Sequence, residues 1–250
     1  MIAAKRPRLI GEIFIAAMLI VVYDHVRQHA SLRRDAAMAH GESILRAERK
    51  LGFDWEAAAN NVLERHHILA EAISWWYQLA HLTVTFSVLA WCFVTWPAGY
   101  RRARNALVLT NVTGLFVFLT YPVAPPRLLP DSGFTDTVAV TLGGALPEAP
   151  DQYGAMPSLH LAWATWVAVT VWMIAKEKGL PARVRVAGVT YPCLTAIAVV
   201  TTANHYVFDV FAGTAVAALA VELAWSPVRS RFAAPAPQAD TRPAPAAATP

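Results

Sequence analysis

Long apolar stretches alternate with shorter polar ones along most of the chain, and this pattern predicts membrane-spanning helices. A helix that crosses a bilayer needs about 20 mostly apolar residues. Six stretches meet that requirement, and from them we predict an all-α fold, a polytopic membrane bundle of six transmembrane helices. The six stretches are residues 9–25, 73–96, 106–123, 159–175, 184–203 and 207–225.

The first apolar stretch follows basic residues, as the core of a secretory signal does. Residues 21–24, Val-Val-Tyr-Asp, contain no small-x-small cleavage site, so we interpret the stretch as a membrane anchor. Residues 1–26 then form the N-terminal segment and first helix, and residues 73–232 a five-helix membrane core. Residues 233–250 are Ala/Pro-rich without apolar periodicity, which predicts a disordered cytoplasmic tail.

Residues 27–72 are too polar to span a bilayer but contain one helical pattern. Asp54 fits an N-cap, and this predicts an outward-facing interfacial helical segment along the membrane surface. A solvated hairpin packed on the bundle would give the same pattern, and the sequence leaves both alternatives open. The apolar side chains that follow at helical spacing are Trp55, Ala58, Ala59, Val62 and Leu63.

Composition agrees with a membrane protein. The chain is 56% hydrophobic and 15% charged, with a mean hydropathy of +0.38, whereas soluble domains carry roughly 25% charged residues. The net charge of +4 comes from basic residues in short clusters between apolar segments, which argues against nucleic acid as a partner. Cys92 and Cys193 both lie in apolar runs, so we predict neither a disulfide framework nor a CxxC metal site.

The basic residues also predict an orientation. Thirteen of the 21 Lys and Arg residues fall on one side of the predicted bundle, together with both termini. Because positively charged loops stay in the cytoplasm, we predict a multi-pass protein of the cell (plasma) membrane with both termini cytoplasmic. The loops that carry Arg127, His160 and His205 then lie on the extracytoplasmic side.

Three stretches on that side are unusually polar, and the first is YPVAPPRLLPDSGF, residues 121–134. Its prolines stiffen the exit from the third helix and hold Arg127 near the interface. There the guanidinium could offer a planar fork of donors to phosphate. Snorkelling to lipid headgroups is an equal alternative for this arginine.

The second stretch is GAMPSLH, residues 154–160. Pro157 and Ser158 stand where a helix should begin, because proline is tolerated in a first turn and serine caps well. A helix N-terminus favours a bound anion, and His160 would lie in this first turn, facing whatever is bound. A satisfied interfacial histidine is the alternative interpretation.

The third stretch is ANHYVFDVFAG, residues 203–213. His205 and Asp209 are four residues apart and share a helix face, so the carboxylate can hold the imidazole in one tautomer. This is the orienting half of a nucleophilic triad. Two histidines and a carboxylate are also a credible set of metal ligands, and spacing does not exclude a metal site.

The ordered pair PSxH and HYxxD in these stretches, supported by YPVAPPR, resembles the type 2 phosphatidic acid phosphatase superfamily of membrane phosphotransferases. The likeness covers about residues 73–225 and is greatest to the branch that contains inositol phosphorylceramide synthase. By that resemblance His205 attacks phosphorus to form a phosphohistidine, Asp209 orients it, and His160 protonates the leaving oxygen. The resemblance implies no metal and no cofactor.

Two departures from that family's pattern bear on substrate binding. Phosphatase members carry a serine-arginine pair upstream of the nucleophilic histidine, where this chain has Ala198 and Val199, and a lysine in the first motif that is missing here. The loss resembles the synthase branch and implies transfer to a lipid or polyol hydroxyl as well as hydrolysis. Phosphate binding would rest instead on Arg127, Ser158, Asn204 and Tyr206.

The sequence thus predicts a metal-independent lipid phosphotransferase or lipid phosphate phosphatase, with a lipid phosphate or phospholipid substrate and an unspecified oligomeric state. A transporter or channel lined by the same polar residues is the alternative, and Glu222 in the last helix is its best support. A metallohydrolase is a third hypothesis, which chelators would test. For His81, in the second helix, we favour a bond to a neighbouring helix backbone over one to the active-site helices.

Overall fold

The computed structural model describes residues 7–53, 55–143 and 153–226, and helices make up most of these ranges. Within them there is no strand, only an isolated backbone bridge between Val123 and Gly154. The elements in chain order are α1 (Leu9–Ser31), α2 (Arg34–Lys50), α3 (Trp55–Glu64), α4 (His67–Trp75), η1 (Trp76–Ala80), α5 (His81–Thr95), α6 (Pro97–Thr120), η2 (Pro126–Leu128), α7 (Thr137–Leu142), α8 (Leu159–Glu177), α9 (Ala182–Thr201) and α10 (Val207–Trp225).

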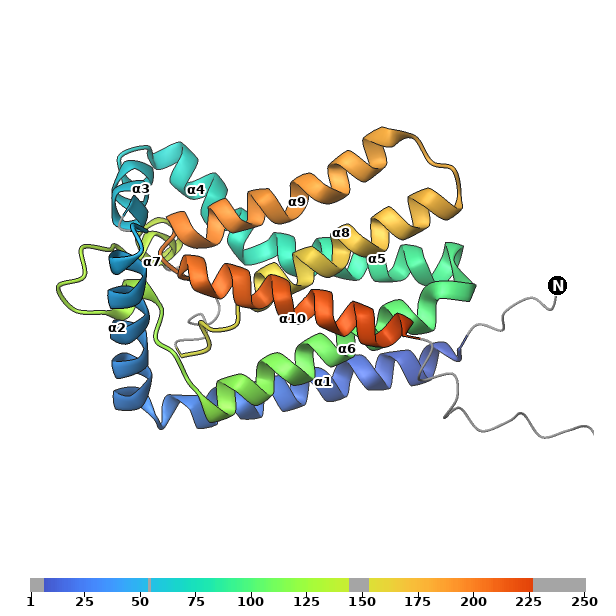
Figure 1. Cartoon of the computed structure of the whole chain (residues 1–250), viewed down its shortest axis with the longest axis horizontal. Helices are drawn as coiled ribbons and strands as arrows, with labels where there is room; N and C mark the ends of the chain where they lie inside the picture. Colours follow the sequence, from blue (N-terminus) through green and yellow to red (C-terminus); the bar gives the residue numbers. More distant parts are fainter. Residues whose placement is uncertain (1–6, 54, 144–152, 227–250) are drawn as a thin grey trace, which may run out of the picture.

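Within these described ranges six helical segments are long and apolar enough to cross a membrane, which confirms the predicted all-α membrane bundle. They are α1, the continuous stretch His67–Thr95, α6, α8, α9 and α10. Figure 1 shows these helices running along the long axis of the molecule. Asp54, the predicted N-cap, and the predicted disordered tail 233–250 lie outside the described residues.

The second and third spans begin earlier than predicted, at His67 and Pro97. Hydropathy detects the apolar middle of a helix, whereas its ends follow backbone geometry, and Pro97 occupies a first-turn position that suits proline. The early turns of α6 carry Arg104, whose charge is paired with Glu12 of α1 at 3.2 Å. An arginine with such a partner can lie inside a spanning helix.

Helices α2 and α3 lie across one end of the bundle (Figure 1). The N–H of Ala124 donates to the carbonyl of Ala37 at 3.0 Å, and Nη1 of Arg33 donates to the carbonyl of Leu119 at 2.8 Å. These bonds favour the hairpin packed on the bundle, one of the two alternatives for this segment. Its position along a membrane surface stays a prediction.

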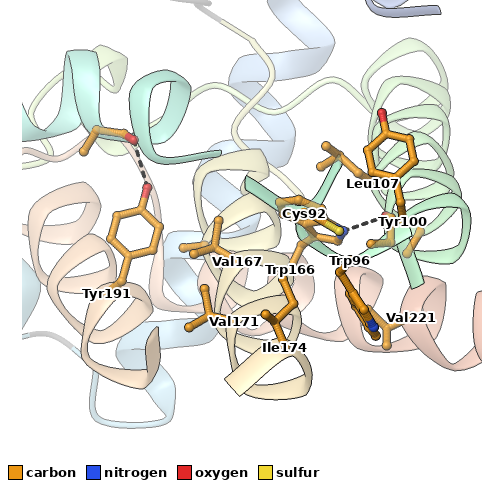
Figure 2. Close-up of a cluster of buried hydrophobic side chains, with 14 residues drawn as sticks. Cys92, Trp96, Tyr100, Leu107, Trp166, Val167, Val171, Ile174, Tyr191 and Val221 are labelled. Carbon is orange, nitrogen blue, oxygen red and sulfur yellow. Dashed lines mark hydrogen bonds between the residues drawn. The ribbon is translucent and has the colours of Figure 1, made fainter. Parts of the chain in front are cut away.

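A large cluster of buried side chains packs α5, α6, α8, α9 and α10 against one another. Figure 2 shows the cluster around Trp166 of α8, which is fully buried and donates from Nε1 to the carbonyl of Ala103 at 2.8 Å. Helix α8 packs against α5, α6, α9 and α10, whereas α1 lies along α6. The helix that begins next to His160 is therefore held on several sides.

Candidate active site

Backbone hydrogen bonds bring the three polar stretches together at the end of the bundle covered by α2. The N–H of Val123 donates to the carbonyl of Tyr153 at 2.8 Å, which joins the first stretch to the segment before the second. The N–H of Arg127 donates to the carbonyl of Ala203 at 3.0 Å, which joins the first stretch to the third. These bonds connect the three polar stretches to one another.

His205 lies between α9 and α10 with its imidazole oriented by two acceptors. Its Nδ1 is 2.8 Å from the carbonyl oxygen of Ala155 and 3.3 Å from Oδ2 of Asp209. Because both neighbours are acceptors, Nδ1 must carry the hydrogen, which leaves the lone pair on Nε2. Oδ2 of Asp209 also accepts the N–H of Tyr206 at 2.9 Å, so the carboxylate is itself fixed.

The turn that leads into His205 has a strained backbone. Ala203 has a φ of +56°, in the left-handed region that costs a residue with a Cβ roughly 1 kcal/mol or more. The N–H groups of Asn204 and His205 both donate to the carbonyl of Val199 at 3.1 Å. These bonds close the end of α9 and fix the direction in which the histidine leaves it.

His160 stands in the first turn of α8, as predicted, and faces His205. Ser158 is the N-cap, and its hydroxyl accepts the N–H of Leu161 at 3.4 Å. The ring centroids of His160 and His205 are 5.5 Å apart. Nε2 of His160 is buried and has no hydrogen-bond partner among the residues that the structure describes.

The far side of the His160 ring is covered by the second span. Tyr77 stacks on it with centroids 4.5 Å apart, and His81 meets it edge-on at 4.3 Å. Nδ1 of His81 bonds to the carbonyl of Tyr77 at 3.0 Å. The predicted bond of His81 to a neighbouring helix is therefore wrong: it bonds to the backbone of its own span, and its ring also contacts His160.

A cavity of about 470 Å³ begins at these histidines and extends along the bundle between α1, α5, α6 and α8. Its far end is lined by Glu12, Tyr100 and Arg104. The hydroxyl of Tyr100 donates to Glu12 at 2.9 Å, and Arg104 pairs with the same carboxylate at 3.2 Å. Its middle is lined by apolar side chains, among them Ile15, Leu19, Leu82, Leu89 and Leu107.

A family model described as the PAP2 superfamily matches residues 42–223, most of the chain. The chain belongs to the PAP2 superfamily. This confirms the family that the sequence motifs resemble, whereas the branch of inositol phosphorylceramide synthase stays a prediction. The match begins within α2 and leaves α1 outside it.

One solved structure supports the PAP2 fold. The crystal structure of Aquifex aeolicus LpxE is similar with a TM-score of 0.53 at 18% sequence identity, over 70% of this chain and 93% of that chain. At this identity the likeness concerns the fold alone. A search of curated proteins finds no significant match.

The predicted substrate-binding residues of this PAP2 protein differ in their surroundings. Asn204 lines the cavity and has a buried, unpartnered Oδ1 within the described part of the chain. Arg127 donates from Nε to Asp136 at 3.0 Å, and its side chain is 2% exposed. The hydroxyl of Tyr206 donates to the carbonyl of Ala124 at 2.8 Å, and that of Ser158 caps α8. Phosphate binding by these four residues stays a prediction.

Sequence reasoning missed Glu48 and Glu56, two buried carboxyl groups beside α10. Glu56 accepts the N–H of Val207 at 2.8 Å, and Glu48 accepts the N–H of Phe208 at 2.6 Å. Helical spacing is the signal that could have found Glu48, because Glu48 lies on the buried face of α2. The other buried residues of that face are Ala37, Gly41, Ile44 and Leu45.

The metal alternative has no support from a ligand cluster in the described ranges, where no three His, Cys, Asp or Glu side chains are placed to hold a metal ion. Nδ1 of His205 is hydrogen-bonded to Ala155 and Asp209. The ring of His160 contacts the ring of His205. The roles of the two histidines as nucleophile and acid, and a reaction that needs no metal, stay predictions.

Proposed function

We propose that this chain is an integral membrane enzyme that transfers or hydrolyses the phosphoryl-containing group of a lipid phosphate or phosphodiester through a phosphohistidine on His205. One observation carries the proposal: the imidazoles of His160 and His205, with centroids 5.5 Å apart, meet at one end of a mostly apolar cavity. Membership of the PAP2 superfamily supports it.

The proposed first step uses Nε2 of His205 as the nucleophile. The N–P bond forms as the P–O bond to the leaving group breaks, and His160 donates a proton to the leaving oxygen. The positive charge that develops on His205 is stabilised through Nδ1–H by Asp209 and the carbonyl of Ala155. The leaving group departs neutral.

In the second step an acceptor oxygen attacks phosphorus and the N–P bond breaks. His160 removes the proton from the acceptor, and its resting state is restored. Because the two histidines account for every proton and electron pair, we propose that the reaction is metal-independent. We also propose that Asn204 and Arg127, with Ser158 and Tyr206, help to bind the phosphoryl group.

The lining of the cavity favours a lipid over a solute in transit. Its middle is apolar, and Leu82 and Phe86 of α5 line it and are exposed. A hydrocarbon chain could therefore enter from the bilayer, with its phosphate at the histidines. Glu222, the best support for a transporter, is exposed on α10 and does not line this cavity.

The acceptor decides whether the enzyme is a phosphatase or a synthase. Ala198 and Val199, which stand where phosphatase members have a serine-arginine pair, are buried in α9 at 3% and 0% exposure. They leave one cationic phosphate ligand fewer near His205. We propose activity like that of inositol phosphorylceramide synthase, with transfer to a hydroxyl alongside hydrolysis, at the extracytoplasmic face of the plasma membrane.

The test is to incubate purified protein with phospholipids and polyprenyl phosphates, with and without a polyol such as inositol, and to measure free phosphate and new lipid. Replacing His205 with Gln should lower turnover about a thousandfold. The exposed His67, replaced in the same way, is the matched control. Unchanged turnover in the His205→Gln variant would reject the covalent mechanism, and full inhibition by chelators would favour the metallohydrolase.

A further inference from the structure

Two carboxyl groups from outside the spanning helices hold the first turn of α10. Glu56 of α3 and Glu48 of α2 accept the N–H groups of the consecutive residues Val207 and Phe208. Both glutamates are almost fully buried, at 2% and 0% exposure. The next residue in that turn is Asp209, which orients His205. The pair therefore lies directly behind the nucleophile.

Each of these carboxyl groups uses only one of its two oxygens, Oε1, to accept a backbone N–H. Oε2 of Glu48 and Oε2 of Glu56 are both buried without a hydrogen-bond partner, as far as the described ranges extend. Two adjacent carboxylates would repel each other, and the same site contains Asp209. One proton held between the two glutamates would replace repulsion with a hydrogen bond and would give both oxygens a partner.

The pKa values of the two glutamates agree with a proton retained between them. Burial, followed by the charge of Glu56, raises the pKa of Glu48 to about 9. Burial also raises the pKa of Glu56, against the lowering effect of the hydrogen bonds from the N–H of Val207 and from Glu48. The charge of Asp209 adds to the rise, and that of Arg49 opposes it. Burial, followed by the charge of Asp209 and then by those of Glu48 and Glu56, raises the pKa of Tyr206. Near neutral pH the pair therefore keeps a proton.

We propose that Glu48 and Glu56 share a proton and act as positioning residues for His205, through the first turn of α10. This rests on the function proposed for His205. The N–H groups that begin a helix normally attract anions, and here carboxyl oxygens already occupy them. The start of α10 is thereby closed to phosphate, and its single function is to fix Asp209 and His205. The shared proton also limits the negative charge beside an incoming phosphate.

The first experiment compares neutral substitutes with deletions of the carboxyl group. Glu48→Gln preserves an oxygen for the N–H of Phe208 and offers Glu56 a donor, so it should keep turnover within about twofold of the wild type. Glu48→Ala leaves a buried N–H without its acceptor and should lower kcat about tenfold with little change in KM. Glu42→Gln is the matched control, because Glu42 is exposed on the same helix.

The second experiment needs no activity. A folded-state pKa raised to about 9 means that the folded protein holds a proton that the unfolded chain releases near 4.5. The stabilisation from this proton is complete below pH 4.5 and is lost as the pH rises toward 9. The thermal midpoint of wild-type protein in nanodiscs should therefore fall, relative to that of Glu48→Gln, between pH 5 and 9.

The two experiments separate the possible failures. Parallel thermal midpoints of wild type and Glu48→Gln across that pH range would overturn the shared proton, whatever the reaction is. Full turnover in Glu48→Ala, with His205→Gln inactive, would overturn the positioning role and leave the proposed function standing. Equal losses of turnover in Glu48→Ala and Glu48→Gln, with normal turnover in Glu42→Gln, would overturn the proposal that an uncharged carboxyl group at Glu48 positions His205.

Discussion

A single carboxylate controls the chemistry available to His205. Asp209 has 0% exposure and accepts hydrogen bonds from the N–H of Tyr206 and from Nδ1 of His205. Oδ2 of Asp209 accepts from both Tyr206 and His205, so in an Asp209→Asn variant one amide group must take both places. If the amide oxygen takes them, the imidazolium that forms on His205 loses its counter-charge. If the NH₂ group takes them, it faces two donors, and the imidazole should rotate or change tautomer.

We expect Asp209→Asn to lower kcat by about 10²–10⁴, by analogy with the loss of an orienting carboxylate in a catalytic triad. Turnover of a lipid phosphate measures the effect, and the thermal midpoint shows whether the fold survives. Glu222→Gln changes an exposed acidic residue on the same helix and should be without effect. An Asp209→Asn enzyme with wild-type kcat would mean that the Ala155 carbonyl alone orients the histidine.

At the scale of elements, the site depends on how α8 is seated on α10. The N–H of Ser158 donates to the carbonyl of Asp209 at 3.1 Å, which ties the cap of one helix to the first turn of the other. Gly213 makes this approach possible, since a Cβ there would clash with the carbonyl of Ser158. The glycine in the third polar stretch therefore positions His160 relative to His205.

Gly213→Ala should push the start of α8 away from α10 and separate the two imidazoles. Because precise placement of an acid and a nucleophile is worth large factors in rate, we expect kcat to fall about tenfold to a hundredfold. Gly11→Ala is the matched control, because Gly11 also lies in a spanning helix and a Cβ there meets nothing within 4 Å. Equal turnover in both variants would show that the helices adjust without cost.

At the scale of the whole molecule, the sequence predicts what depends on local pattern. Length and hydropathy predict the six spans, and the spacing of His205 and Asp209 predicts their contact, because both signals are contained within one segment. The meeting of His160 with His205 comes from resemblance to a family rather than from spacing. The ends of the spans are less accurate, since they depend on caps and on ion pairs such as Arg104 with Glu12.

Other features arise only when distant segments pack. Glu48 and Glu56 belong to a charged segment, and their burial depends on α10, more than 150 residues away. Tyr77 and His81 cover His160 because α5 and α8 are neighbours. Arg127 has the predicted location near the site, but its guanidinium bonds to Asp136, a partner that the sequence does not indicate.

The cavity extends from the two histidines to Glu12 and Arg104, and its length gives a prediction about the substrate. Helix α1 supplies one wall, on which Ala16 faces the cavity, whereas the adjacent Ala17 is exposed on the outside. Ala16→Trp would fill the middle of the cavity and leave the histidines untouched. If a hydrocarbon chain occupies this space, long-chain lipid phosphates should lose about tenfold in kcat/KM, while short-chain analogues keep theirs.

Ala17→Trp adds the same side chain at an exposed position of α1 that does not line the cavity, and should leave both substrates unaffected. The measurement is kcat/KM for a short-chain and a long-chain lipid phosphate in each variant, under one detergent or nanodisc condition. Selective loss of the long chain in Ala16→Trp would place the substrate between α1 and α5. Equal loss for both chain lengths would mean that the tryptophan disturbs the histidines, and no loss for either would place the chain elsewhere, with α1 serving only as an anchor.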